Sequence, residues 1–361
     1  MDGIGDEAVQ LAVVGVQGLV TAAQRGLEGF VRAGECGRGQ ARGGQPVHRG
    51  CGPFGQVGEV AGRFNEAHGP SQNHPQTRCN KARFCLWNSP RITHTLGRMR
   101  IGLLQITTSD DKADNLRLAS EKIREAADKG ATLIVCPEAT SQAFDSGRLD
   151  TQAEELDGPF ATGLRELADE LGVTIVAGMF RPADSQGEIN RVYNTALITG
   201  NGLHEGYDKI HTFDTAQYQE SKTVRPGTDL HTFTHEGVTV GVAICFDIRY
   251  PEQFKQLARE GAKVIVVPTS WADGENKVEQ WNILSRARAL DAGVFIMAPD
   301  QARPGGSAEA GKNSGPTGVG HSMAVAPDGR ILAEGGYEPE VLVVNIDPDE
   351  AAKQQESLPL L

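Results

Sequence analysis

Residues 237–252 constrain the fold of this chain more than any other stretch. Their apolar positions alternate with small side chains: Val238, Val240, Val242 and Ile244. This period of two predicts a strand over residues 238–244 whose two faces are both buried. A polar segment follows, with Pro251 near the start of a predicted helix that runs to Ala258 or Arg259 and is closed by Gly261. The chain therefore passes from a buried strand into a helix, with Cys245 at the junction.

The position of Cys245 admits two interpretations. A side chain at a sharp strand-to-helix junction is held clear of the sheet with backbone N–H groups around it, as in a nucleophile elbow. Cys245 is therefore a candidate nucleophile. A cysteine at the end of an apolar strand is equally suited to be a small buried core residue, so this segment by itself leaves both interpretations open.

Strands and helices alternate through the chain from Met99 onward. Residues 100–106 predict a strand, followed by a helix capped by Ser109 or Asp110 and a strand over 131–136, which together make a β-α-β unit. Further helices are predicted over 157–171 and 277–292, and further strands over 173–179, 193–198, 230–234, 264–268, 294–298 and 341–346 and near Met323 and Ile331. Residues 303–320 are expected to form a surface loop. Apolar strands interleaved with helices predict an α/β fold in which helices cover the sheets.

Residues 1–98 differ in composition from the rest of the chain. They hold ten arginines but one lysine, and 18 of the 44 glycines, without a sustained hydrophobic period. Such a segment has too little apolar surface to offset the entropy cost of ordering it. We expect the folded domain to span residues 99–361, and residues 1–98 to be a disordered extension or the product of a start codon placed upstream of Met99. A regulatory or interaction tail is the alternative.

Charge and cysteine content exclude several classes of function. The net charge of -12 argues against a nucleic-acid binder, which needs a basic face. No apolar run approaches the roughly 20 residues that span a bilayer. The six cysteines form no CxxC pair or regular ladder, so neither a zinc site nor a disulfide framework is indicated. We expect a cytoplasmic protein with free thiols that needs no metal or cofactor and has no nucleic-acid or membrane partner.

Two charged residues follow predicted strands elsewhere in the chain. Glu138 comes just after the strand over 131–136, and Lys209 lies in a polar segment over 206–214. The ends of strands are where α/β sheets place functional groups. A thiol needs a base and a donor for the oxyanion to attack a carbonyl, and no histidine after Met99 lies in a cysteine-partner motif. Glu138, Lys209 and Cys245 are thus a candidate catalytic set, although a charged residue at a strand end is often only a solvated loop residue.

Three motifs follow one another along the chain: Pro137-Glu138, Tyr207-Asp208-Lys209-Ile210-His211, and Cys245-Phe246-Asp247-Ile248-Arg249-Tyr250-Pro251-Glu252. They resemble the signature motifs of the nitrilase superfamily of carbon–nitrogen hydrolases, and the resemblance extends from Met99 to the C-terminus. It implies a four-layer αββα sandwich and a homodimer. It also implies that Glu138 is the general base, that Lys209 stabilises the oxyanion and that Cys245 is the nucleophile. Glu220 would be a second glutamate that orients Lys209.

The segment after Cys245 is similar to the amidase-type branch related to ω-amidase and deaminated-glutathione amidase. The implied reaction is hydrolysis of a non-peptide C–N bond in a small carboxylated amide, with release of ammonia through a cysteine thioester. The backbone N–H of Phe246 would face the oxyanion, and Arg249 and Lys222 are candidates to hold the carboxylate. Lys209 and Glu220 are only eleven residues apart, fewer than in ω-amidase-like relatives, so the precise substrate is not carried over. A nitrilase or an N-carbamoyl amidohydrolase with the same catalytic set, and a non-enzymatic scaffold with an interaction tail, are the alternatives.

Overall fold

Two six-stranded sheets lie at the centre of the protein in the computed structural model, which describes residues 97–216 and 218–361. The prediction for the segment 1–98 falls almost entirely outside the described residues and stays a prediction. From Met99 onward the chain begins its first strand where the sequence predicted one.

The first sheet contains the strands from the N-terminal half of the described chain together with the last strand. Its order is β12 (Glu340–Ile346), β1 (Met99–Gln105), β2 (Leu133–Val135), β3 (Thr174–Gln186), β4 (Ile189–Gly200) and β5 (Leu203–Asp208). β1, β2 and β3 are parallel, whereas the remaining pairs are antiparallel.

The second sheet repeats this arrangement. Its order is β11 (Ile331–Glu334), β10 (Met323–Val325), β9 (Phe295–Ala298), β8 (Val264–Val266), β7 (Val238–Val242) and β6 (His231–His235). β7, β8 and β9 are parallel, and the flanking pairs are antiparallel.

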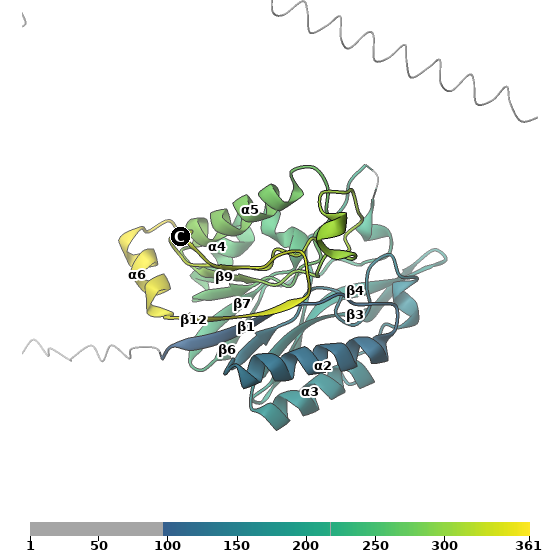
Figure 1. Cartoon of the computed structure of the whole chain (residues 1–361), viewed down its shortest axis with the longest axis horizontal. Coiled ribbons are helices and arrows are strands. Elements are labelled where there is room, and N and C mark those ends of the chain that lie inside the picture. Colours follow the sequence, from purple (N-terminus) through teal and green to yellow (C-terminus); the bar gives the residue numbers. More distant parts are fainter. Residues whose placement is uncertain (1–96, 217) are drawn as a thin grey trace, which may run out of the picture. The chain divides into compact units, whose positions relative to one another are not determined.

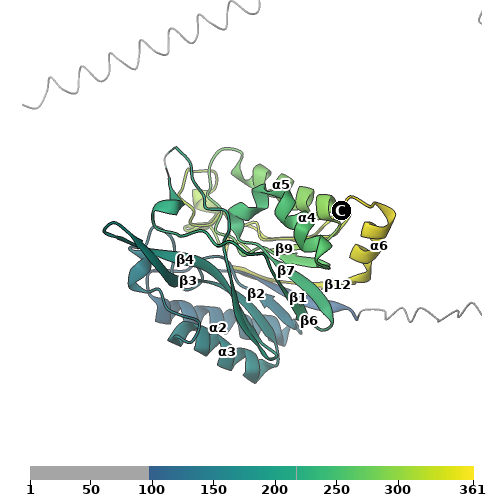
Figure 2. The same ribbon diagram turned by 180° about the vertical axis from the view of Figure 1, so that it is seen from behind.

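Helices cover the outer face of each sheet. α2 (Lys112–Asp128) and α3 (Pro159–Leu171) lie against the first sheet, and α4 (Pro251–Arg259) and α5 (Lys277–Ala292) lie against the second (Figures 1 and 2). A further helix, α6 (Asp349–Ser357), follows β12. The order helix, sheet, sheet, helix confirms the expected four-layer αββα sandwich.

The alternation of side chains along each strand explains why purely apolar strands were predicted. In β2, Leu133 and Val135 belong to the core shared with the second sheet, while Ile134 belongs to the core under α2 and α3. Successive side chains of a strand point to opposite faces, and here both faces are covered. A strand of this kind therefore carries apolar side chains at every position, because both of its faces are buried.

The predicted boundaries of strands and helices are wrong where the side chains are no longer buried. β3 and β4 run on beyond the predicted strands as a hairpin whose outer side chains are partly or fully exposed, so no hydrophobic period marks them. β5 and α6 were not predicted, because β5 is a partly exposed edge strand and α6 buries only Ala351. The first helix is capped by Asp111, which accepts from the N–H groups of Ala113 and Asp114, and not by Ser109 or Asp110.

The loop over residues 303–320 is not simply the surface excursion that was predicted. Its two ends are buried, since Arg303 and Val319 are almost inaccessible. Arg303 Nε lies 2.9 Å from Asp273 Oδ2, and this buried ion pair draws the loop onto the body of the protein. The hydroxyl of Ser270 then donates to the carbonyl of Pro316 at 2.7 Å. The loop therefore forms part of a pocket wall.

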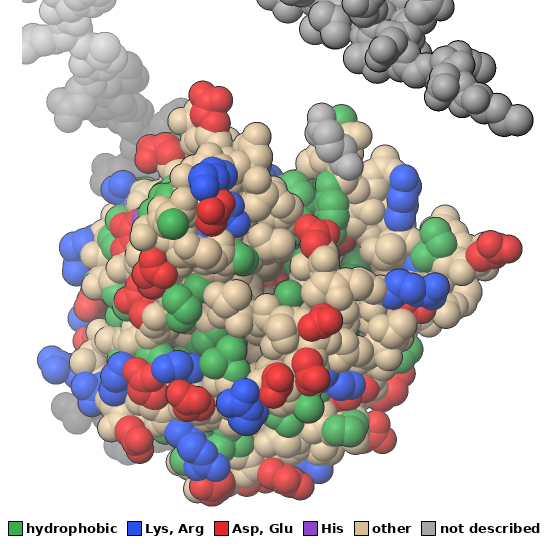
Figure 3. Space-filling view, turned by 45° about the vertical axis from the view of Figure 1, so that its right-hand side comes forward, with side chains coloured by type: hydrophobic (Ala, Val, Ile, Leu, Met, Phe, Trp, Pro, Cys, Tyr) green, Lys and Arg blue, Asp and Glu red, His purple; other side chains and the backbone are tan. Residues whose placement is uncertain are grey.

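The face drawn in Figure 3 carries lysine, arginine and carboxylate side chains interspersed with one another. Hydrophobic side chains form small scattered patches on it. No helix among residues 97–216 and 218–361 combines the length and apolar character needed to cross a membrane.

Gly178 of β3 lies against the backbone that carries Glu138. A Cβ at this position would be 2.5 Å from Ala139 N and 2.7 Å from Glu138 Cα. The Gly178 N–H also donates to the carbonyl of Pro137, and its carbonyl accepts from Ser141 N. A glycine inside a strand often marks such a close approach of another backbone.

We therefore expect Gly178→Ala to displace the segment that carries Glu138. Overpacking of this kind costs about 1–3 kcal/mol in unfolding free energy. With Glu138 as the general base that the sequence predicts, kcat should also fall at least roughly ten-fold, because small misplacements of a catalytic group are costly. Thermal unfolding and steady-state kinetics measure the two effects. Gly97→Ala, whose Cβ would meet open space, is the control. Unchanged kcat and unfolding in Gly178→Ala would contradict the expected role.

Candidate active site

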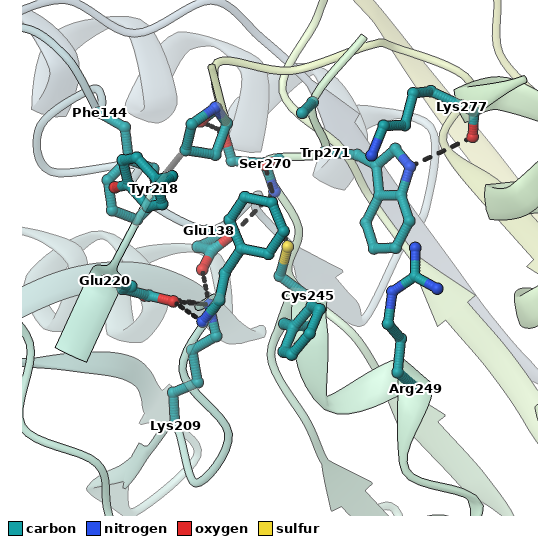
Figure 4. Close-up of a pocket in the computed structure, with 14 residues that line it drawn as sticks. Glu138, Phe144, Lys209, Tyr218, Glu220, Cys245, Arg249, Ser270, Trp271 and Lys277 are labelled. Carbon is teal, nitrogen blue, oxygen red and sulfur yellow. Dashed lines mark hydrogen bonds and ion pairs between the residues drawn. The ribbon is translucent and has the colours of Figure 1, made fainter. Parts of the chain in front are cut away.

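Glu138, Lys209, Glu220 and Cys245 line one pocket at the ends of strands from both sheets (Figure 4). Glu138 follows β2, Lys209 follows β5, and Cys245 comes after β7. The pocket has about 400 Å³ of empty space, its open mouth included. Side chains far apart in the sequence therefore lie together, because the strand ends that carry them lie at the same pocket.

Cys245 occupies a strained backbone position at the junction that the sequence predicted. Its φ of 45° lies in the left-handed region, which a cysteine rarely adopts. It begins the short 3₁₀ helix η3 (Cys245–Arg249), and α4 follows directly. Its N–H donates to the carbonyl of Pro268 at 3.0 Å, and its thiol Sγ is 3.9 Å from the Ser270 carbonyl. Strain of this type costs about 1–3 kcal/mol and persists only where the surroundings hold it in place.

Asp247 stabilises much of this turn, which carries the strained backbone of Cys245. Its fully buried carboxylate accepts from Ile244 N at 2.8 Å and from the Tyr207 hydroxyl at 2.7 Å. It also accepts from His211 N at 3.0 Å, and His211 Nδ1 lies 2.8 Å away. Because His211 is two residues after Lys209, this network joins the turn of the nucleophile to the segment that carries the lysine.

Lys209 is held between two glutamates. Its Nζ is 2.9 Å from Glu138 Oε1 and 3.1 and 3.0 Å from the two oxygens of Glu220. All three side chains are at most 2% exposed. Glu220 also accepts from Phe213 N at 2.5 Å, which fixes the short segment between the lysine and the second glutamate.

Two further groups position Glu138, and the sequence did not reveal either of them. Asn194 of β4 donates from Nδ2 to Glu138 Oε1 at 2.7 Å and to Glu220 Oε1 at 3.1 Å. Ser270 N donates to Glu138 Oε2 at 2.9 Å. Asn194 is a polar side chain among buried neighbours in a strand, and that was the signal available in the sequence. Ser270 acts through its backbone, so its residue type carries no signal.

The buried charges shift the pKa values of the site. Burial alone lowers the pKa of Lys209, but Glu138 and Glu220 outweigh it and hold that pKa well above its ordinary value. Lys209 is therefore a cation in the resting site. Burial raises the pKa of Glu138, and the charge of Glu220 adds to this rise.

The Cys245 thiol is not activated in the resting site. Burial, followed by the negative charge of Glu138, raises its pKa well above the ordinary value, and Lys209 offsets this only in part. The sulfur is therefore a neutral thiol until its proton is removed. A base has to take the proton as the sulfur attacks.

The pocket has two unlike walls around Cys245. Phe144 and Tyr218 lie on the side of Glu138 and Glu220, whereas Trp271, Arg249 and Lys277 lie on the other side (Figure 4). Phe213, Phe246, Ser270, Ala272 and Pro316 complete the lining. Phe144, Trp271 and Lys277 were not identified from the sequence, because nothing in their local pattern separates them from surface or core positions.

The structure treats the two predicted carboxylate-binding residues differently. Arg249 and Phe246 line the pocket with the catalytic candidates. Lys222 lies in the short 3₁₀ helix η2 (Glu220–Lys222), where its side chain is exposed and takes no part in the pocket lining. Among residues 97–216 and 218–361, no group of three or more His, Cys, Asp or Glu side chains is arranged to hold a metal ion.

The sequence matches the family described as carbon-nitrogen hydrolase over residues 100–355. The chain belongs to the carbon–nitrogen hydrolase family. The chain is 41% identical over 270 residues to a hydrolase of Mycobacterium tuberculosis, and the aligned region covers 73% of this chain and 94% of that protein. It is 30% identical over 272 residues to an omega-amidase of Xenopus laevis, again with 73% and 94% of the two chains covered.

Solved structures agree with this assignment. Nit3 of Saccharomyces cerevisiae, a member of branch 10 of the nitrilase superfamily, has a TM-score of 0.62 and 27% identity, and covers 73% of this chain and 95% of its own. A mutant amidase from Nesterenkonia, with covalent addition of the acetamide moiety of fluoroacetamide at the active site cysteine, has a TM-score of 0.58 and 26% identity, with 72% and 94% covered. The predicted nitrilase-superfamily membership and the prediction of a carbon–nitrogen hydrolase are thereby confirmed.

Removal of the Asn194 amide tests its role in positioning the two glutamates. A hydrogen bond to the Glu138 carboxylate lowers the pKa of that carboxyl group, so Asn194→Ala should raise this pKa further. The acidic limb of the kcat/KM profile should therefore move to higher pH. Because a hydrogen bond to a charged group contributes about 1.5–3 kcal/mol, we expect kcat/KM to fall at least roughly ten-fold near neutral pH.

Asn190→Ala is the matched control, since Asn190 is an exposed asparagine of the same strand. It should leave the pH profile unchanged. An acidic limb that stays in place in Asn194→Ala would rule out the positioning role.

Proposed function

We propose that this hydrolase is an amidase that cleaves the C–N bond of a small carboxylated amide through a thioester on Cys245. The observation that carries the proposal is the buried Lys209 held between Glu138 and Glu220 in the pocket that Cys245 lines. Buried ionisable groups with shifted pKa values cluster at functional sites. Here the acid, the base and the nucleophile that amide hydrolysis needs are all within one pocket.

Acylation begins with the neutral thiol. Glu138 takes the proton from Cys245 Sγ as the sulfur attacks the amide carbonyl carbon. The oxyanion that forms is stabilised by the cationic Nζ of Lys209 and by the backbone N–H of Phe246, which belongs to the first turn of η3, where N–H groups have no intrahelical acceptor. Glu138 then returns its proton to the amide nitrogen, the C–N bond breaks, and ammonia leaves.

Deacylation reuses the same groups. Glu138 takes a proton from a water molecule that attacks the thioester carbonyl, and Lys209 again faces the oxyanion. The C–S bond breaks, the sulfur recovers a proton from Glu138, and a carboxylic acid leaves. A raised pKa suits Glu138 to act as a base in one step and as an acid in the next.

The character of the substrate follows from the unlike walls of the pocket. The departing nitrogen would face Glu138, which lies on the same side of the pocket as Phe144 and Tyr218. Arg249 on the other side offers a positive charge to a carboxylate on the acyl arm. The relatives described as omega-amidases support an amide over a nitrile, while a nitrilase or an N-carbamoyl amidohydrolase would use the same catalytic set.

A substrate panel separates these activities. We expect the full chain to release ammonia from short ω-amides such as succinamate, and to be far slower with the matching nitriles and N-carbamoyl acids. Cys245→Ala should lose at least roughly 10³-fold in kcat because it removes the nucleophile. Ammonia release and mass spectrometry of a trapped acyl-enzyme measure the result. Nitrile turnover faster than amide turnover, or full activity in Cys245→Ala, would overturn the proposal.

We further propose a cytoplasmic homodimer. Cys136 and Cys245 are free thiols in the described part of the chain, as suits a reducing compartment. Ile283 and Leu290 lie two turns apart on α5 with 54% and 43% of their surface exposed, a pattern that favours burial against a second copy.

Sedimentation velocity tests the dimer. The native chain should sediment at twice the mass of one chain, and Ile283→Glu should shift it toward the monomer because a charge would be buried at the interface. Ile189→Glu, at another exposed isoleucine, is the matched control and should remain dimeric. A native protein that sediments as a monomer would refute the dimer.

A further inference from the structure

Two cations line the pocket without taking part in the bond-breaking steps. Arg249 and Lys277 are both partly buried, and in Figure 4 they lie on the same side of Cys245 as Trp271. Within the described residues, neither side chain has a carboxylate within 4 Å, whereas other buried cations of the protein, such as Lys209 and Arg303, are paired. Partial removal of a charge from water without a counter-ion is unfavourable. Two such cations in the lining of one pocket therefore favour the binding of an anion there.

Trp271 and Gln280 position the Arg249 guanidinium, and Trp271 also holds the backbone of Lys277. Arg249 Nη2 donates to Gln280 Oε1 at 2.9 Å, and its guanidinium carbon lies 5.2 Å from the centroid of the Trp271 ring. Trp271 Nε1 in turn donates to the carbonyl of Lys277 at 3.2 Å. Trp271 thus contacts the side chain of Arg249 and the backbone of Lys277, and a preorganised guanidinium loses little entropy when it binds a ligand.

The pKa shifts of Arg249 and Lys277 also favour the binding of an anion. Burial lowers the pKa of Arg249. Burial also lowers the pKa of Lys277, and the positive charge of Arg249 lowers it further. The two like charges therefore disfavour each other in the empty pocket, and a bound anion relieves this.

The proposed mechanism determines which part of the substrate lies near Arg249 and Lys277. The amide carbonyl has to lie at Cys245 and Lys209, and the departing nitrogen has to face Glu138. The acyl arm then extends to the opposite side, along Trp271 and toward the two cations. A ligand in this orientation presents the far end of its acyl arm to Arg249 and Lys277.

We propose that Arg249 and Lys277 form one anion subsite for the carboxylate at the far end of the acyl arm, and that Lys277 makes the enzyme select anionic over neutral amides. The substrate class is then the monoamide of a short dicarboxylic acid. This inference rests on the proposed function for the orientation of the substrate, but the subsite itself can be tested without turnover.

The first experiment compares succinamate with butyramide, a neutral amide of similar size, in the full chain. The selectivity is the ratio of the two kcat/KM values. In Lys277→Met this ratio should fall about ten-fold or more, through a higher KM for succinamate, because a charge-assisted contact is lost. Lys263→Met is the matched control, since Lys263 is another partly buried lysine whose pKa burial lowers and it lies outside the pocket. An unchanged ratio in Lys277→Met, or a native enzyme that prefers butyramide, would overturn the proposal.

The second experiment measures succinate binding to the Cys245→Ala protein by calorimetry, with intrinsic tryptophan fluorescence, to which Trp271 contributes, as an independent signal. Binding should weaken about ten-fold when Lys277→Met is added, and should weaken as the salt concentration rises. If no amide is hydrolysed but succinate binds and the binding depends on Lys277, the subsite stands and the proposed function fails. If amides are hydrolysed and succinate does not bind, the subsite fails and the proposed function stands.

Discussion

The ion pairs of Lys209 with Glu138 and Glu220 are the interaction on which the rest of the site depends. Three charged groups removed from water carry a large desolvation cost, and only close pairing with further hydrogen bonds offsets it. The protein provides both, since Asn194 donates to the two glutamates and Ser270 N donates to Glu138. Loss of Lys209 would leave two buried carboxylates without their shared counter-ion. This requirement explains why both sheets and the ends of three strands converge on a single lysine.

A second constraint acts on the nucleophile. Cys245 has a backbone conformation that a cysteine rarely adopts, and the buried carboxylate of Asp247 stabilises the turn through Ile244 N, Tyr207 and His211. The same carboxylate reaches the segment after Lys209. The positions of Cys245 and Lys209 are therefore set by one network, so that a change in either is transmitted to the other. A neutral thiol in such a site depends on geometry rather than on a lowered pKa.

Much of the fold was predictable because burial leaves a pattern in the sequence. β7 and β8 are covered on both faces, and their runs of β-branched residues predicted both strands. β5, α6 and the outer half of the β3–β4 hairpin were missed, since partly exposed elements carry no comparable hydrophobic period. The ends of the 303–320 loop looked solvent-exposed by composition, yet the Arg303–Asp273 pair buries them. An ion pair between residues 30 positions apart has no local signature.

The sequence by itself determined the catalytic candidates, because Glu138, Lys209 and Cys245 each stand in a motif beside a strand and require no knowledge of distance. It also determined the strand-to-helix junction at Cys245, since strand and helix periods are local properties. Only the tertiary structure decided which other residues reach the pocket. It brought in Asn194, Trp271 and Lys277 and left Lys222 on the surface, because proximity between distant segments depends on how the two sheets pack and where their strands end. The unlike walls of the pocket, with Phe144 and Tyr218 on one side and Trp271, Arg249 and Lys277 on the other, exist only in the folded chain for the same reason.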